Sequence, residues 1–89
     1  MLYSEIKMAL QVFDLGERCT IAQIKKRYRE LVKKHHPDTG EQPDDKTIVQ
    51  INTAHEILMS YCADYQFNFS EKEFLRQCPE ERFKRQFWT

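Results

Sequence analysis

Hydrophobic residues recur at three- and four-residue steps through most of the chain, which is the spacing of amphipathic α-helices. A first helix is predicted from Ser4, its expected N-cap, to about Phe13. Gly16 is expected to end it, because glycine adopts a positive φ without a Cβ penalty. The predicted buried face of this helix consists of Ile6, Ala9, Leu10 and Phe13.

The second predicted helix has the clearest pattern. Thr20 is expected to be its N-cap, and Gln23, three residues later, completes a capping box. Pro37 is expected to stop the helix, because the residue before a proline is pushed out of the α region. The predicted buried stripe is Ile21, Ile24, Tyr28, Leu31, Val32 and His35.

A third helix is predicted from about Asp45 to Ala63, after a loop that contains Gly40 and Pro43. Two amphipathic helices with a short connection pack as an antiparallel hairpin. The His36-Pro37-Asp38 loop is then expected at the exposed tip of that hairpin. The predicted buried face of the third helix is Ile48, Ile51, Ala54, His55, Leu58, Tyr61, Cys62 and Tyr65.

Aromatic residues gather beyond Tyr65: six of the eleven in the chain lie between residues 67 and 88. Ser70 and Glu73 predict a capping box that opens a short helix to about Gln77, and Pro79 suits the first turn of a last helix. The predicted division is 1–65 for the main domain and 66–89 for an extension. Four side chains are expected to pack back on the hairpin and enlarge a small core, with an exposed patch or terminal disorder as alternatives: Phe74, Leu75, Phe83 and Phe87.

Composition supports one small all-α domain. The chain has 89 residues, 40% of them hydrophobic, and only two glycines. Three cysteines without a C-x-x-C spacing suggest free thiols in a reducing compartment. Neither a secretion signal nor an apolar run of 18 residues is present, so the expected location is the cytoplasm, with no membrane partner.

The net charge is zero, but the second predicted helix is basic. Between Thr20 and His35 the only acid is Glu30, against six Lys and Arg residues. A helical projection places four of them in a strip beside the apolar stripe, which we call the basic strip: Lys25, Lys26, Arg29 and Lys33. A basic face on a neutral protein suggests an acidic protein partner, although a solvated helix face would have the same composition.

The stretch around His36 contains residue types that can bind metals or take part in catalysis. His35 and His36 point about 100° apart on a helix and cannot chelate one ion as an i, i+4 pair would. A chance site with His55 and the cysteines is the remaining metal alternative, and no metal or cofactor is expected. His36 and Asp38 lie in an exposed loop without a nearby nucleophile or sheltered cleft, which argues against an enzyme.

A basic helix after a turn also resembles a helix-turn-helix reader of DNA. Here the exposed N-terminal turn of the helix offers no Asn or Ser to read bases, and the whole chain is not basic, so no nucleic-acid partner is expected. Pro37 restricts the backbone, so that His36 and Asp38 are presented in a nearly preset arrangement. A rigid loop beside a basic strip is typical of a protein-docking surface.

The run Q-I-K-K-R-Y-R-E-L-V-K-K-H-H-P-D, residues 23–38, resembles helix II and the loop of the J domain of DnaJ-family co-chaperones. The later run I-N-T-A-H-E-I-L, residues 51–58, resembles that domain's helix III. Together the resemblance covers about Leu10 to Tyr61. Five residues match family positions that pack the hairpin: Ile24, Leu31, Ile51, Ala54 and Leu58.

The resemblance implies a partner rather than a reaction. J domains bind the ATP state of seventy-kilodalton heat-shock chaperones of the DnaK type and accelerate ATP hydrolysis by them. His36, Pro37 and Asp38 match the signalling tripeptide of the family. The helix II face that meets an acidic chaperone surface is matched by Tyr28, Lys25, Lys26, Arg29 and Lys33.

The chain departs from the family pattern in several places. Phe13-Asp14 replaces a Leu-Gly pair, His55 stands where tyrosine is usual, and Ile48 where phenylalanine is common. Thr39-Gly40 replaces a frequent basic-Asn pair, and the signature of the family's fourth helix is absent. The 89 residues contain no zinc-binding repeats or client-binding domain, so they are identified as a short form, expected to be a monomer. The alternative is a J-like interaction module with another partner. Candidate contacts with a client or specific partner are Phe83, Phe87 and Trp88.

Overall fold

The computed structural model describes residues 1–35 and 45–81. The described chain is helical and contains no strand, in agreement with the predicted all-α class. The predicted tripeptide, His36-Pro37-Asp38, and the aromatic residues Phe83, Phe87 and Trp88 lie outside the described residues. The helices are α1 (Tyr3–Phe13), α2 (Ile21–Lys34), α3 (Asp45–Asp64) and α4 (Glu71–Gln77).

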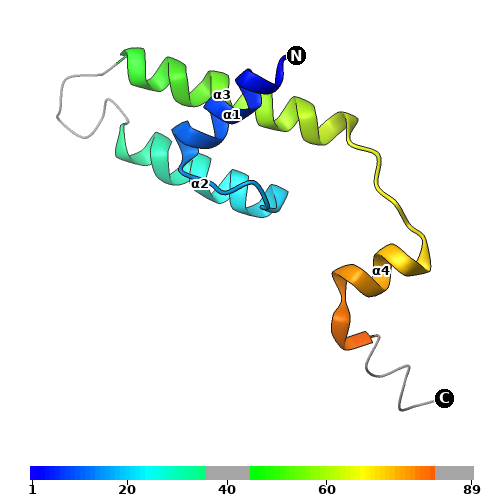
Figure 1. Ribbon diagram of the computed structural model, residues 1–89. Helices are drawn as coiled ribbons and strands as arrows, with labels where there is room; N and C mark the ends of the chain where they lie inside the picture. Colours follow the sequence, from blue (N-terminus) through cyan, green and yellow to red (C-terminus); the bar gives the residue numbers. More distant parts are fainter. Residues whose placement is uncertain (36–44, 82–89) are drawn as a thin grey trace.

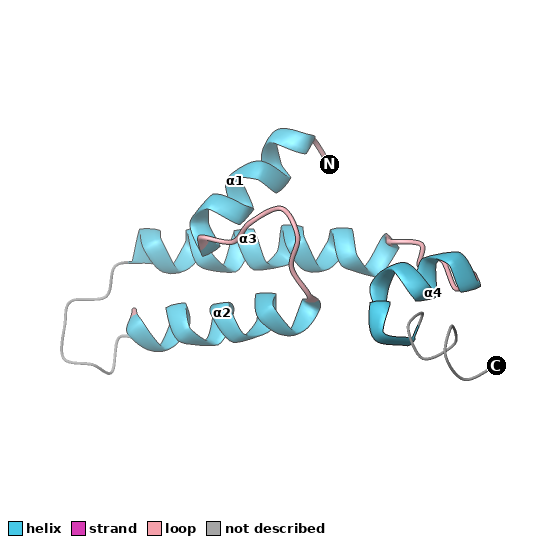
Figure 2. Ribbon diagram, turned by 60° about the horizontal axis from the view of Figure 1, so that its bottom comes forward, coloured by secondary structure: helices cyan, strands magenta, loops and turns pink. Residues whose placement is uncertain are grey.

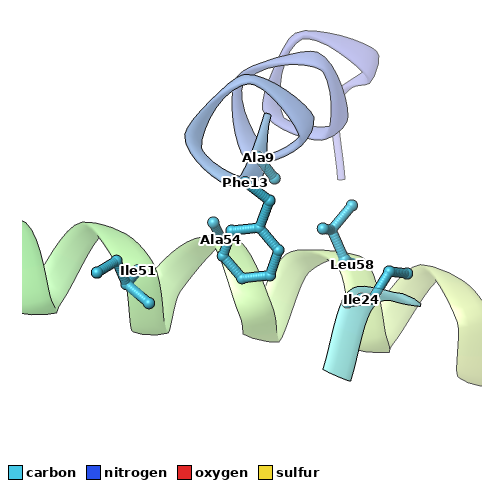
Figure 3. Close-up of a cluster of buried hydrophobic side chains, with 6 residues drawn as sticks. All are labelled: Ala9, Phe13, Ile24, Ile51, Ala54 and Leu58. Carbon is cyan, nitrogen blue, oxygen red and sulfur yellow. The ribbon is translucent and has the colours of Figure 1, made fainter. Parts of the chain in front are cut away.

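The centre of the fold is the predicted antiparallel hairpin. Figure 2 shows α2 and α3 lying side by side, with α1 crossing them and packing mainly on α3. Phe13 of α1 has no solvent exposure and points between the hairpin helices (Figure 3). Burying such a side chain stabilises the fold by roughly 1.5–3 kcal/mol. The other core residues are Ala9, Ile24, Ile51, Ala54 and Leu58.

The predicted start of the second helix is confirmed. Thr20 is the N-cap of α2; its backbone N–H donates to Gln23 Oε1 at 2.7 Å, and the Gln23 N–H donates to Thr20 Oγ1 at 3.1 Å. The predicted Ser4 cap of the first helix is wrong, because α1 already begins at Tyr3. Here the Glu5 carboxylate accepts a hydrogen bond from the Leu2 N–H at 3.0 Å, which places the start of the helix earlier.

The end of α1 also corrects a prediction. The left-handed residue is Asp14, with φ 53° and ψ 45°, and not Gly16. The Asp14 N–H donates to Gln11 O at 3.1 Å and the Leu15 N–H donates to Leu10 O at 3.0 Å. This pair of bonds is the Schellman motif, which satisfies the last carbonyls of a helix. Leu15 then packs against the core and fixes the turn into α2.

Three residues predicted on buried faces are instead exposed: Ile21, Tyr61 and Tyr65. The last two follow from the unequal helix lengths, because α3 has 20 residues and α2 has 14. At about 1.5 Å per residue, α3 is roughly 9 Å longer than α2. Tyr61 therefore lies on the end of α3 that the shorter helix leaves uncovered, and Tyr65 lies just beyond it.

The short helix α4 begins as predicted at Ser70, whose Oγ accepts from the Glu73 N–H at 3.2 Å. The predicted capping box is only half formed, because the Ser70 N–H donates to Asn68 Oδ1 at 3.0 Å and not to Glu73. Figure 1 shows α4 beyond the end of α3 and away from α1 and α2. Phe74 on α4 is half exposed, so its predicted packing on the hairpin is not seen.

Residues 79–81 are helical at the end of the described chain, and the rest of the predicted last helix lies outside it. Within residues 1–35 and 45–81, none of the helices combines the length and apolar character that crossing a membrane requires.

Candidate partner-binding surface

The basic strip, Lys25, Lys26, Arg29 and Lys33, is exposed along α2. None of its members forms an ion pair with another of the described residues. Within the described part of the chain these four positive charges, spread over three helical turns, have no ion-pair partner, so they create a local positive potential on a chain whose net charge is zero. The structure therefore presents the strip as a surface that can attract an acidic partner.

Arg27 belongs to the same basic helix but has a structural role that the sequence analysis missed. Its Nε donates to the Phe13 carbonyl at 2.8 Å, and its Nη1 donates to Glu30 Oε2 at 3.2 Å. The first bond joins α2 to the last turn of α1 and satisfies a carbonyl that the helix end leaves open. In the sequence, this role could have been inferred from the helical projection, which places Arg27 about 100° from Tyr28 and on the side of α2 opposite to the strip.

Tyr28 lies at the boundary between the strip and the core. Its hydroxyl donates to Asn52 Oδ1 at 2.7 Å, and its ring stacks on His55 with centroids 3.9 Å apart and planes 21° apart. The ring of Phe13 lies 6.4 Å away. These contacts tie α2 to α3 through one side chain. Tyr28 thus helps to hold α2, with the strip, in place on α3. Its predicted contact with a partner stays a prediction.

The strip runs to the C-terminal end of α2, and the predicted tripeptide follows that end in the sequence. α2 ends at Lys34, and the His35 N–H donates to Leu31 O at 3.1 Å as the C-cap. The positive charges of Lys33 and Lys34 in the last turn interact favourably with the negative end of the helix dipole. His36 follows His35 in the sequence, so the tripeptide begins three residues after Lys33, the last member of the strip.

The described residues offer little other chemistry. No group of three or more His, Cys, Asp or Glu side chains that could hold a metal ion occurs within 1–35 and 45–81. Cys19, Cys62 and Cys78 are free thiols. Burial, and to a smaller degree the neighbouring Cys19, raises the pKa of the Cys62 thiol, which makes that thiol a poor nucleophile at neutral pH.

Comparison with known proteins assigns the fold. The family model of the DnaJ domain matches residues 5–63, which run from α1 through α3 and make up about two thirds of the chain. The chain belongs to the DnaJ-domain family. Members of this family act on a partner chaperone and are not enzymes, in agreement with the expectation from sequence.

The relatives support the same assignment. The DnaJ chaperone of Finegoldia magna is 36% identical over 55 residues, covering 60% of this chain and 15% of that protein. A DnaJ-like protein of Mycoplasma pneumoniae is 34% identical over 76 residues, covering 83% of this chain and 23% of the relative. A J domain-containing protein of Schizosaccharomyces pombe is 50% identical over 38 residues, covering 40% and 14%. This DnaJ domain thus spans less than a quarter of each of these relatives. No solved structure matches the chain.

Proposed function

We propose that this DnaJ domain binds the ATP state of a DnaK-type heat-shock chaperone and stimulates its ATP hydrolysis. The observation that carries the proposal is the exposed basic strip on α2 of a DnaJ-family fold, which forms no ion pair among the described residues and precedes His36-Pro37-Asp38 in the sequence. Relatives that share the domain carry the name chaperone protein DnaJ. The reaction takes place in the partner, so the domain needs no catalytic group or cofactor of its own.

The strip and the tripeptide would contribute in different ways. Lys25, Arg29 and their neighbours would steer the encounter with an acidic surface, a long-range effect that weakens with salt. Asp38 would then accept charge-assisted hydrogen bonds from a basic side chain of the chaperone, and a carboxylate can take an arginine in bidentate fashion. Pro37 restricts the backbone between His36 and Asp38, which lowers the entropy lost on docking.

The contacts of Tyr28 with Asn52 and His55 support this arrangement, because they hold α2 on α3 beside the strip. Without that anchor the strip and the loop would lose their fixed relation to the rest of the domain. The rival function is a J-like interaction module that keeps the fold and serves another partner. The proposal also includes a domain boundary between residues 65 and 66, a cytoplasmic location and a monomeric state. It further includes client contacts through Phe83, Phe87 and Trp88.

A single-turnover ATPase assay with the cognate chaperone tests the proposal. The wild-type chain should accelerate hydrolysis, and Asp38→Asn should return the rate to that of the chaperone alone, because the amide lacks the negative charge that a basic partner group requires. Asp64→Asn, at the exposed end of α3, is the matched control and should stimulate like the wild type. No stimulation by the wild type, or full stimulation by Asp38→Asn, would refute the co-chaperone role.

A further inference from the structure

A continuous row of exposed aromatic rings begins where the C-terminal part of α3 extends past the N-terminal end of α2. We call it the aromatic ladder: Tyr61, Tyr65, Phe67 and Phe69. Successive ring centroids are 5.9, 5.7 and 6.2 Å apart, the range in which aromatic pairs attract each other. Exposure rises along the ladder from 50% for Tyr61 to 91% for Phe69. Exposed apolar patches of this kind mark interaction sites.

The ladder is also shaped by its backbone. Tyr65, Phe67 and Phe69 alternate with Gln66 and Asn68 in a segment without helical structure between α3 and α4. In an extended chain, alternate side chains project to the same side, which brings the three rings together. Asn68 Oδ1 accepts from the Ser70 N–H at 3.0 Å and so fixes the end of this segment against α4. The ladder is therefore built into the connection and does not arise from one loose side chain.

Charge around the ladder points to the nature of its occupant. Residues 60–81 contain five acids, Asp64, Glu71, Glu73, Glu80 and Glu81, against two bases, Lys72 and Arg76, so the region carries a net charge of −3. An occupant with aromatic side chains and positive charge would match both properties. A second copy of the ladder would not, since antiparallel pairing would bring Asp64 near the Glu71 of the other copy.

The chain itself carries a segment with the required chemistry. Residues 82–89, R-F-K-R-Q-F-W-T, lie outside the described structure and contain three bases, three aromatic residues and no acid. The seven residues of α4 span only about 10 Å, and eight residues can reach up to about 27 Å, so the ladder is within range of Glu81. Because it is tethered, the segment also has an effective concentration on the order of millimolar at the ladder, which favours docking even when the intrinsic affinity is weak.

We propose that residues 82–89 dock on the aromatic ladder of the same chain, with Phe83, Phe87 and Trp88 against the rings and the basic side chains near the surrounding acids. This interaction would cover the largest run of exposed aromatic surface among the described residues. The three C-terminal aromatics would then be intramolecular contacts, and an external client would have to compete with the ladder for them. The proposal does not depend on the chaperone partner.

Trp88 is the only tryptophan of the chain, so its fluorescence reports the docking directly. In the wild-type chain of 89 residues, Trp88 should emit at shorter wavelength than free tryptophan and resist quenching by acrylamide, at all protein concentrations. The double variant Phe67→Ser with Phe69→Ser should shift the emission to longer wavelength and increase quenching. Both side chains are mostly exposed, so circular dichroism should show that the helices are retained.

Two further variants control for this result. Tyr3→Ser removes another exposed aromatic residue, from α1, and should leave the emission of Trp88 unchanged. Phe83→Ser changes the other side of the proposed contact and should shift the emission as the ladder variant does. Wild-type emission like that of free tryptophan, or an unchanged spectrum in the ladder variant, would overturn the proposal. A short-wavelength emission that appears only at high protein concentration would assign the ladder to a second copy and would also overturn it.

Discussion

Asp14 is the one non-glycine residue with a positive φ among the described residues, and it ends α1 where the chain turns toward α2. Left-handed geometry costs an L-residue roughly 1–2 kcal/mol, and aspartate tolerates it better than most. The two backbone bonds of the Schellman motif and the packing of Leu15 hold this conformation in place. A single residue thereby determines how Phe13 enters the core and where Arg27 meets the end of α1.

At this scale we predict that Asp14→Gly raises the free energy of unfolding by about 0.5–1 kcal/mol, because glycine removes the Cβ strain but loses more entropy on folding. Urea denaturation measures the change. Gly16→Ala is the control: no atom lies within 4 Å of its would-be Cβ and its φ is not in the left-handed region, so alanine should be neutral or stabilise by about 0.4–1 kcal/mol. A clear loss of stability in Gly16→Ala would show that Gly16 carries the special conformation.

Among the elements, α4 depends most on its own sequence, because it lies away from α1 and α2 (Figure 1). Seven residues are too few for a stable helix without help from caps and side-chain pairs. The Ser70 cap and the side-chain bonds of Glu73 to Arg76 and Gln77 supply that help. The hydrogen bonds that the Glu73 carboxylate accepts from Arg76 and then Gln77 lower its pKa to about 2, well below its usual value.

This shift predicts a pH dependence of α4. A carboxyl with a lowered pKa contributes stability above its unfolded value, near 4.5, and loses the contribution as the pH falls toward 2. We expect the helical NMR shifts of residues 71–77 to decline in that window, while those of α2 and α3 change less. Glu73→Gln should show a weaker helix at neutral pH and little further loss on acidification. An α4 that stays equally helical in the wild type from pH 5 to 2 would contradict this role of Glu73.

For the whole molecule, the distribution of charge matters more than the total, which is zero. The basic strip lies along α2, while residues 60–81 around the ladder are acidic. A neutral protein with separated charged faces can orient itself toward partners of opposite sign at each of them. The two faces lie on separate elements of the fold, α2 on one side and the α3 to α4 connection on the other (Figure 1).

We therefore predict that Lys25→Ala with Arg29→Ala weakens association with the chaperone by about tenfold at low ionic strength and flattens its dependence on salt. Surface plasmon resonance over a range of salt concentrations measures both effects. Lys7→Ala with Lys72→Ala removes the same charge from exposed positions outside the strip and should change the affinity little. Equal losses in the two variants would mean that only net charge matters, and an unchanged affinity in the first would exclude the strip as a docking surface.

Features that depend on local spacing could be predicted from the sequence alone. Helical periodicity, the Thr20–Gln23 cap and the hydrophobic stripes gave the three main helices and the hairpin, because these features act within one or two turns. The motif around His36 and the DnaJ-like helices gave the family. The members of the basic strip were also predictable, since a helical projection needs only their positions in the chain.

Features that depend on neighbours distant in sequence became visible only in the packed fold. Only the packing shows that Arg27 serves the end of α1 and that Tyr28 is anchored to Asn52 and His55. Periodicity also placed Tyr61 and Tyr65 on a buried face, yet burial requires a partner helix that reaches them. Because the N-terminal end of α2 does not reach far enough along α3 to cover them, those rings stay exposed and begin the aromatic ladder. A pattern in the sequence defines an apolar face, and only the fold decides which part of that face is covered.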